Sequence, residues 1–202
     1  VTTPKVSAEF ATVSIVIDVE NESDTEKTVS VKTRLVAADG VTVISLDGES
    51  RIVNGSRHKF QFEAAVHYPK LWSVESPNLY RTETEILVDG EIVDTESTTF
   101  GIRKIEFSAE KGFLLNGVPT LLKGGCVHHD NGILGAASYA RSEERKVEIH
   151  KASGFNAIRC AHNPPAPAFL DACDRLGMLV IDEAFDCWRE GMNNGDYHVA
   201  FD

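Results

Sequence analysis

The sequence predicts two domains of different fold class, an antiparallel β-sandwich in residues 1–103 followed by an α/β segment in residues 104–202. Two observations support this prediction. The first region alternates apolar and polar side chains with a period of two, which is typical of half-buried strands. The second region orders its segments as strand, helix, strand, helix and strand, which is typical of a parallel sheet covered by helices.

The strands of the first region are short and are separated by turn signals. Apolar side chains share one face in the segments Val13–Val19, Val29–Leu35, Phe60–Ala64, Tyr80–Val88 and from Ile92 onward. Dipeptides that tolerate positive φ and suit tight turns occur at Asp39-Gly40, Asp47-Gly48, Asn54-Gly55 and Asp89-Gly90. About seven strands in about 100 residues favour a sandwich of immunoglobulin-like size. The cysteine pair of antibody domains is absent, so only the architecture is predicted.

A hairpin opens the second region and leads into its first parallel strand. Residues Gly112–Pro119 predict a hairpin that turns at Asn116-Gly117. Leu121 and Leu122 then lead a short strand into Gly124-Gly125.

The first helix is expected to begin at Ser142, a suitable N-cap. Glu143 and Glu144 would lie in its first turn, where the helix dipole favours negative charge. Gly154 suits the position just after the helix, because glycine readily adopts the left-handed conformation there. The next strand is expected at Phe155–Arg159.

The second helix is expected to begin near Pro167, after Pro164-Pro165, and to end at Gly177. Met178–Ile181 then forms a nearly all-apolar strand, which predicts burial on both faces. This order fits either an open doubly wound sheet or a (β/α)8 barrel. No G-x-G-x-x-G follows a strand, so the signal for nucleotide binding is weak. A barrel takes about 250 residues, so this chain would hold roughly three of its eight strands.

Composition argues against several classes of function. With 20 Lys and Arg against 31 Asp and Glu the net charge is −11, which disfavours nucleic-acid binding. No run of eighteen apolar residues occurs, so no membrane span is expected. The chain begins without Met and looks like a piece of a longer protein. No C-x-x-C spacing occurs among Cys126, Cys160, Cys173 and Cys187, which argues against structural zinc. Free, partly buried thiols are expected, with a disulfide as the alternative.

Candidate site residues follow the three parallel strands, at the edge where α/β proteins carry their chemistry. These are His128, His129 and Asp130 after the first strand, Arg159, His162 and Asn163 at the second, and Asp182, Glu183 and Asp186 after the third. The alternative is that Arg159 and Asp182 form a buried ion-pair network with a structural role.

Several reaction types find no support at these strand ends. His128 and His129 are neighbours and project to opposite faces of an extended strand, and no H-x-H occurs, so no metal is expected. No G-x-S-x-G elbow is present for serine hydrolysis. Asp182 and Glu183 should also point apart and cannot flank one glycosidic bond, so neither is predicted as nucleophile or general acid.

The same segments resemble glycoside hydrolase family two, which includes β-galactosidases, β-glucuronidases and β-mannosidases. The resembling stretches are Phe113–Gly117, Lys123–Asp130, Gly154–Pro165 and Asp182–Trp188, with Leu71–Tyr80 and Phe100–Arg103 upstream. The resemblance implies an immunoglobulin-like sandwich followed by the first βα units of an incomplete (β/α)8 TIM barrel. Two departures are Asn163, where many members have Tyr, and Cys126-Val127, which replaces the commoner Asn-Arg.

The resemblance also implies an activity, retaining hydrolysis of β-glycosides by a glutamate acid/base and a glutamate nucleophile. Both glutamates are expected beyond Asp202, so no catalytic residue is expected here and the fragment alone should be inactive. His128 and His162 match histidines that line the sugar subsite, and Arg159 matches an arginine near the nucleophile. Further substrate-binding candidates are Asn163, Asp130, Asp182 and Glu183.

Residues 128–137 look most like a bacterial β-galactosidase branch, which favours galactosides. The implied partner is a carbohydrate, with no cofactor, and no nucleic acid or membrane is expected. The sequence does not give the location, and a secreted or periplasmic one is favoured for a bacterial glycan-degrading protein. A non-catalytic carbohydrate-binding or spacer module is the alternative. The open edge of a partial barrel predicts self-association, and residues after about Ala184 are expected to be poorly anchored or held by another chain.

Overall fold

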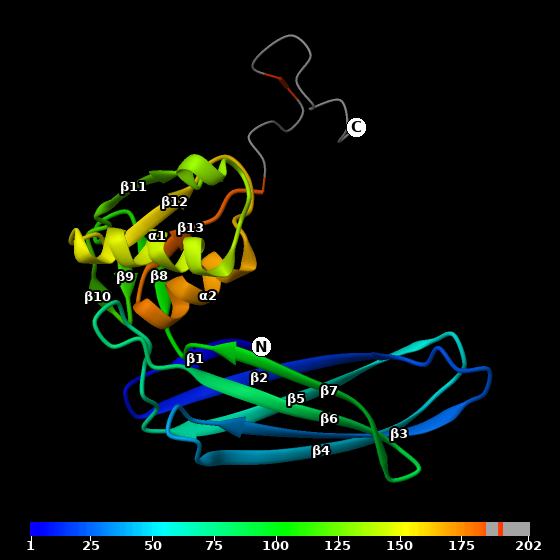
Figure 1. Cartoon of the computed structure of the whole chain (residues 1–202). Helices are drawn as coiled ribbons and strands as arrows, with labels where there is room; N and C mark the ends of the chain where they lie inside the picture. The colour runs from blue at the N-terminus through cyan, green and yellow to red at the C-terminus, as the bar shows by residue number, and fades with distance from the viewer. Residues whose placement is uncertain (185–189, 192–202) are drawn as a thin grey trace. The chain divides into compact units, whose positions relative to one another are not determined.

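The computed structural model describes residues 1–184 and 190–191 (Figure 1). It divides into two compact units, Val1–Thr120 and Leu121–Asp202. The expectations for the chain after Ala184, including Asp186 and Cys187, therefore fall almost entirely outside the described residues. No helix in the described part of the chain is both long enough and apolar enough to span a membrane.

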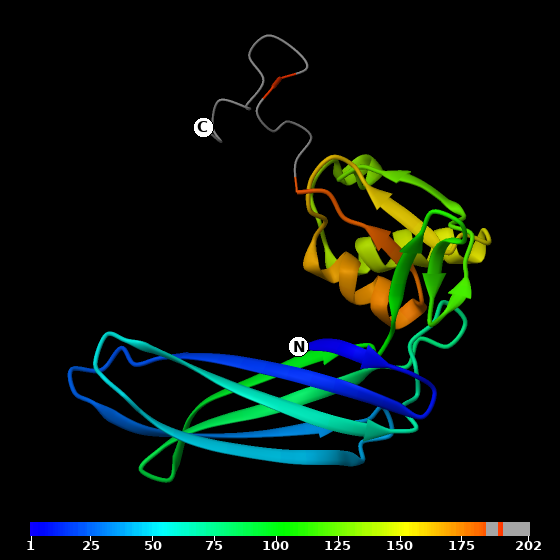
Figure 2. The ribbon, with the colours of Figure 1, turned by 180° about the vertical axis from the view of Figure 1, so that it is seen from behind.

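The first unit contains an antiparallel sandwich of two sheets, seen as stacked layers in Figure 2. One sheet has the order β1-β2-β5, with β1 at Thr2–Val6, β2 at Phe10–Glu20 and β5 at Arg57–His67. The other has the order β4-β3-β6-β7, with β4 at Thr42–Ile52, β3 at Lys27–Val36, β6 at Tyr80–Val88 and β7 at Glu91–Phe100. The predicted antiparallel sandwich is confirmed.

The period-two alternation places the apolar side chains between the sheets. Val13 and Ile15 on β2 pack with Leu35 on β3, and each is at most 2% exposed. Two buried threonines are compatible with this core because the hydroxyl groups of Thr33 and Thr84 bond to each other at 2.9 Å.

One predicted turn is wrong. Asp47-Gly48 lies inside β4, where Gly48 pairs with Val31. A Cβ on Gly48 would lie 3.2 Å from ring atoms of both Phe60 and Phe62, so glycine serves close side-chain packing here and not a turn. Asp89-Gly90, by contrast, has φ values of 53° and 84° and joins β6 to β7 as predicted.

The predicted hairpin is confirmed and belongs to the first unit. Strands β8 (Ile105–Ser108), β9 (Gly112–Leu115) and β10 (Val118–Pro119) form a small sheet that turns at Asn116-Gly117. The Asn116 side chain accepts a hydrogen bond from the Lys104 backbone and donates one to the Trp72 carbonyl oxygen. The domain boundary after Arg103 stays a prediction.

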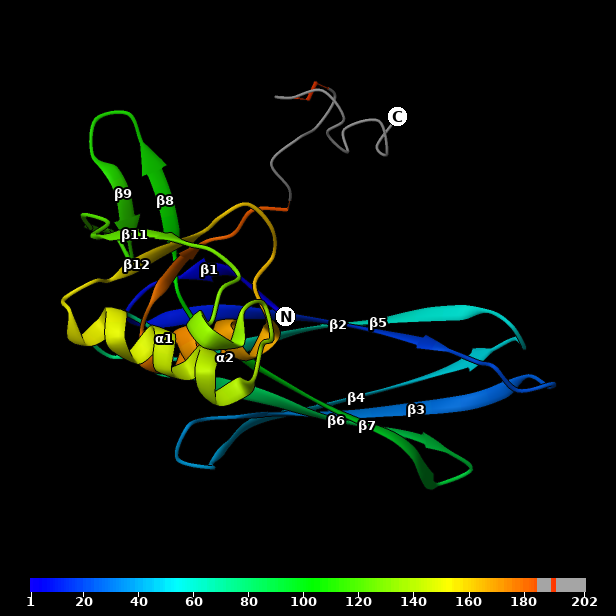
Figure 3. The same cartoon turned by 45° about the horizontal axis from the view of Figure 1, so that its top comes forward.

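The second unit is a parallel sheet of the order β11-β12-β13 with two helices on one face (Figures 1 and 3). The strands are β11 (Gly124–Val127), β12 (Ala157–Cys160) and β13 (Leu179–Ile181), and the helices are α1 (Ala140–Ala152) and α2 (Pro167–Leu176). A short 3-10 helix at Gly132–Leu134 lies between β11 and α1. The predicted alternation of strands and helices is confirmed.

The helix face of this sheet forms the core of the second unit. Ile158 and Cys160 on β12 pack against Val147 of α1 and against Phe169 and Cys173 of α2. Burial raises the pKa of the Cys160 thiol to about 11 and that of Cys173 further still. Cys126, Cys160 and Cys173 are all free thiols, and Cys126 alone of these is exposed.

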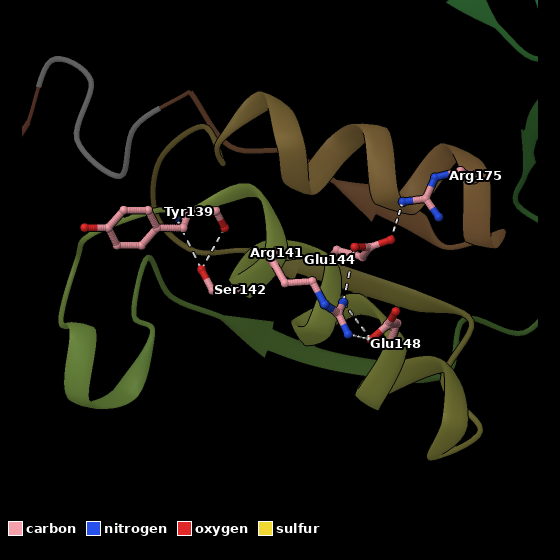
Figure 4. Close-up of polar contacts among 6 residues, drawn as sticks. All are labelled: Tyr139, Arg141, Ser142, Glu144, Glu148 and Arg175. Carbon is pink, nitrogen blue, oxygen red and sulfur yellow. Dashed lines mark hydrogen bonds and ion pairs between the residues drawn. The ribbon is translucent and has the colours of Figure 1, made fainter.

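The start of α1 differs from the prediction (Figure 4). Tyr139 is the N-cap, and Ser142 lies three positions further on. The Ser142 hydroxyl donates to the Tyr139 carbonyl at 2.8 Å and accepts from its backbone N–H at 3.3 Å. Ser142 therefore caps the helix by reaching back from inside the first turn. Gly154 and Gly177, with φ values of 86° and 75°, end α1 and α2 as predicted.

The side chain of Asn156 fixes the approach to β11. It accepts a hydrogen bond from the Lys123 backbone at 2.7 Å and donates one to the Leu121 carbonyl at 2.9 Å. The strand begins at Gly124, later than predicted, and a Cβ there would lie 1.8 Å from the Ala157 carbonyl oxygen. Glycine at position 124 is therefore required for this strand to lie beside β12.

The expected burial of the last strand on both faces is wrong for the described residues. Leu179 is buried, but Ile181 is 47% exposed. Ile181 is level with Arg159 on β12 and Cys126 on β11 in the parallel register. Both described helices of this unit cover the other face, where Ile158 and Cys160 lie.

Candidate functional site

Polar side chains gather where the three parallel strands end. His128 directly follows β11, and His162 follows β12 after a cis peptide bond to Ala161. The two imidazole rings meet edge to face with their centroids 5.5 Å apart. The parallel register thus places two of the predicted site residues in direct contact, although they are 34 positions apart in the sequence.

Arg159 lies between two partners at this edge. Its Nε donates to Oε1 of Glu183 at 2.5 Å, and its Nη1 donates to Sγ of Cys126 at 3.2 Å. The hydrogen bond to Cys126, followed by that to Glu183, raises the pKa of Arg159 above its usual range. The Arg159 guanidinium is therefore a cation at neutral pH.

Glu183 joins the arginine to a histidine. Its second oxygen, Oε2, lies 3.5 Å from Nδ1 of His162, which is within ion-pair distance. A continuous set of contacts therefore runs from Cys126 through Arg159 and Glu183 to His162, and from His162 to His128.

The alternative of an ion pair between Arg159 and Asp182 is not observed, because Glu183 pairs with Arg159 instead. Asp182 is exposed, and no ion pair found among residues 1–184 and 190–191 includes it. Its charge acts instead on Cys160, whose pKa it helps to raise after the larger effect of burial. Adjacent residues leave a strand on opposite sides, which is why one carboxylate alone reaches Arg159.

The remaining candidates lie on the loops beside this group. The Asp130 carboxylate accepts a hydrogen bond from the Gly132 backbone at 2.9 Å and so helps to form the turn after β11. Asn163 is exposed and, with His128 and His129, lines a cavity of about 20 Å³. That volume holds about one water molecule, so a sugar could bind only outside it.

Sequence reasoning missed the role of Glu143. The residue as a whole is only 2% exposed, and its Oε1 accepts hydrogen bonds from Asn131 and Ser138, each at 3.0 Å. Its Oε2 pairs with the Lys146 ammonium at 3.0 Å. Burial opposes ionisation, but the hydrogen bonds from Asn131, Lys146 and Ser138 outweigh it and lower the pKa of Glu143. Glu143 therefore anchors the loop after His128 to α1.

A second polar group lies on the exposed side of the helices (Figure 4). Arg141 bonds Glu148 at 3.0 Å and Glu144 at 3.2 Å, and Glu144 also accepts from Arg175 of α2 at 2.7 Å. These side chains are 29–65% exposed, so solvent screens each pair and its contribution to stability is small. The network links α1 to α2 and takes no part in the site.

No cluster of three or more His, Cys, Asp or Glu suited to a metal ion occurs within the described ranges 1–184 and 190–191. The three histidines nearest the site do not converge. His128 and His162 meet ring edge to ring face, and His129 lines the small cavity beside them. The side chains that do converge are a cation, a carboxylate and an imidazole, which suits hydrogen bonding to hydroxyl groups.

Comparison with known proteins identifies relatives along the whole chain. The family model for glycosyl hydrolases family 2 matches residues 1–103, and the model for the TIM barrel domain of that family matches residues 106–194. A β-galactosidase of Bacteroides ovatus, BoGH2A, is 42% identical over 201 residues, which is 100% of this chain and 24% of that protein. A putative β-glucuronidase of Formosa agariphila is 36% identical over 99% of this chain and 19% of that protein.

Solved structures agree with these matches. The crystal structure of a glycosyl hydrolase family 2 member from Bacteroides cellulosilyticus superimposes with a TM-score of 0.92 at 46% identity, covering 99% of this chain and 26% of that one. The chain thus spans between about a fifth and a quarter of the length of these relatives. The predicted fold class, an immunoglobulin-like sandwich followed by the start of a TIM barrel, is confirmed. From its sequence, its fold and the matched domains, the chain belongs to glycosyl hydrolase family 2.

Proposed function

We propose that the whole protein containing this chain is a retaining β-glycosidase that acts on a neutral sugar, most simply a β-galactoside. The observation that carries the proposal is the linked group of Arg159, Glu183, His162 and His128 at the strand ends. Relatives described as a β-galactosidase and as a putative β-glucuronidase support the β-glycosidase class.

The group can recognise hydroxyl groups. Arg159 uses Nε and Nη1 for Glu183 and Cys126, and no hydrogen bond from its remaining nitrogen occurs among the described residues. That nitrogen is a donor, and each imidazole offers a donor or an acceptor. Hydrogen bonds of this kind can strengthen as a sugar ring flattens toward an oxocarbenium-like transition state.

Local charge supports a neutral sugar over a uronic acid. Among residues 1–184 and 190–191, the strand ends carry one guanidinium, Arg159, whose charge is already balanced by Glu183. Asp130 and Asp182 add two exposed carboxylates nearby in the chain. A substrate carboxylate at this edge would meet more negative than positive charge, so a galactoside is favoured over a glucuronide.

The carboxylates needed for hydrolysis are proposed to come from other parts of the whole protein. A retaining enzyme places an acid/base and a nucleophile about 5 to 5.5 Å apart across the scissile bond. Glu183 is engaged by Arg159, and its neighbour Asp182 is expected to point to the opposite side, so this pair does not supply that arrangement. Residues 1–202 are therefore proposed to bind substrate without turning it over.

The test is hydrolysis of nitrophenyl β-galactoside, β-glucuronide and β-mannoside by the purified whole protein, with NMR of the first-formed anomer. We expect the galactoside to have the highest kcat/KM and the β-anomer to appear first. A glucuronide preferred over the galactoside would overturn the sugar class, and an α-anomer would overturn retention. If the folded protein hydrolysed none of them yet bound galactose, a non-catalytic binding module would replace the enzyme.

A further inference from the structure

We infer that Glu183 is a positioning residue, which orients Arg159 and His162 toward the substrate and does not itself contact the sugar. This inference rests on the proposed function. It assigns to Glu183 a role different from the substrate contact expected from the sequence.

The two carboxylate oxygens of Glu183 have different partners. Oε1 accepts from Arg159 Nε at 2.5 Å, and Oε2 lies 3.5 Å from His162 Nδ1. The Glu183 side chain is 23% exposed, against 39% for Arg159 and 44% for His162. Glu183 is thus the least exposed of the three side chains, and it contacts both of the others. Arg159 and His162 therefore provide most of the exposed surface of this group.

Contact with Glu183 also sets the hydrogen-bonding character of His162. A negative oxygen beside Nδ1 favours the tautomer with its proton on Nδ1, which leaves the lone pair of Nε2 available as an acceptor. Arg159 presents only donors. A donor and an acceptor held by one carboxylate match a sugar hydroxyl, which can accept from the guanidinium and donate to the imidazole.

The contacts of Glu183 are expected to orient Arg159 and His162 and to contribute little to the stability of the fold. Partly exposed ion pairs contribute little to stability, and the core of this unit is built from other residues on the opposite face of the sheet. A misplacement of about 1 Å in a substrate-binding group can cost about 10²-fold in rate. Loss of Glu183 should therefore lower activity strongly while leaving the fold intact.

The first experiment compares Glu183→Ala, Glu183→Gln and Glu148→Gln in the whole protein. Glu148 is the matched control, because it is also a carboxylate paired with an arginine but lies on the exposed side of α1. We expect kcat/KM for the preferred nitrophenyl glycoside to fall about 10²-fold in Glu183→Ala and about 10-fold in Glu183→Gln, which keeps an acceptor for Arg159. Glu148→Gln should retain wild-type activity.

A variant cycle separates positioning from direct contact. If Glu183 acts only through its two partners, adding Glu183→Ala to an Arg159→Ala/His162→Ala variant should change kcat/KM by less than about 3-fold. A further loss of about 10²-fold in that background would show direct contact with the sugar and overturn the inference. Circular dichroism of each variant identifies any that fail to fold.

The 202-residue chain gives a readout that does not depend on activity. In the NMR spectrum, the Arg159 Nε–H signal should be resolved and slowly exchanging in the wild type and in Glu148→Gln. In Glu183→Ala it should move toward the signals of free arginines and exchange faster. An Arg159 signal unchanged by Glu183→Ala would overturn the inference, whereas wild-type protein without hydrolysis would overturn only the proposed function.

Discussion

Glu143→Gln is expected to destabilise the second unit far more than its ordinary position in a first helical turn suggests. The Glu143 side chain is 3% exposed, and it neutralises a Lys146 side chain that is 14% exposed. It also accepts hydrogen bonds from Asn131 and Ser138. The substitution keeps the shape and one acceptor oxygen but leaves the ammonium group without its counter-charge.

The magnitude follows from this burial. Breaking a buried ion pair by removing one partner costs about 3–5 kcal/mol. Here the cost is reduced, because water reaches part of Lys146 and glutamine still accepts from Asn131 or Ser138. We therefore expect Glu143→Gln to lower the free energy of unfolding of the second unit by about 2–3 kcal/mol. The neighbouring Glu144→Gln, which removes an exposed carboxylate, should change this free energy of unfolding very little.

Native-state hydrogen exchange measures this difference within the second unit. The backbone amides of Val147 and Ile158 lie in its core and report its opening free energy. Both substitutions remove one carboxylate from the same turn of α1, so only the burial of Glu143 predicts a difference between them. Equal opening free energies for Glu143→Gln and Glu144→Gln would therefore refute the reasoning.

The same pair predicts a dependence on pH. The folded protein lowers the pKa of Glu143 below its ordinary value of 4.5. Its stabilisation is therefore fully present above pH 4.5 and is lost as the pH falls through the lower folded-state value. The gap between wild type and Glu143→Gln should stay constant from about pH 6 to 8 and narrow below about pH 4.5. A gap that widened on acidification would contradict this sign.

Three further predictions concern the site and the thiols. In the whole protein, His162→Ala and His128→Ala should each lower kcat/KM by about 10²-fold. His150→Ala should match the wild type in the same assay, because His150 lies on α1 and bonds the Lys146 carbonyl there. The 202-residue chain alone should show no hydrolysis of a nitrophenyl β-galactoside above a blank, because it is expected to lack the catalytic glutamates. At pH 8 a thiol reagent should label exposed Cys126 in the folded protein and spare Cys160, whose pKa is about 11, as read by peptide mass mapping.

Local patterns predicted the elements whose cause is local. Alternation identified the strand around Val13 and Ile15, because one buried face fixes the period of a strand. Gly154 and Gly177 marked helix ends, because positive φ is needed there. Gly48 misled the turn prediction, because the need for glycine arises from two phenylalanine rings of another strand. No pattern within β4 contains that information.

The role of Glu143 could not be predicted for a similar reason. Its three partners are a helix neighbour, Lys146, and two loop residues, Asn131 and Ser138. A glutamate in the first turn of a helix is explained by the helix dipole alone, so nothing in the sequence distinguishes it from the exposed Glu144. The distinction arises only when the loop after β11 folds back over α1.

The sequence alone does not show that Glu183, and not Asp182, is the partner of Arg159, because the register of the two strands is also needed. Ile158 and Cys160 pack toward the helices, so alternation alone places Arg159 on the other face of β12. Ile181 pairs with Arg159 in the parallel register and lies on that face. Residues two apart share a side of an extended chain, so Glu183 lies on the side of Ile181 and reaches Arg159, whereas Asp182 is expected on the opposite side. The period is visible in the sequence, but the register that aligns Arg159 with Ile181 is set by the packing of two strands that a helix separates. Once that register is known, the contact of Arg159 with Glu183 follows from the period of two, whereas the contact of Glu183 with His162 depends on the loop after β12.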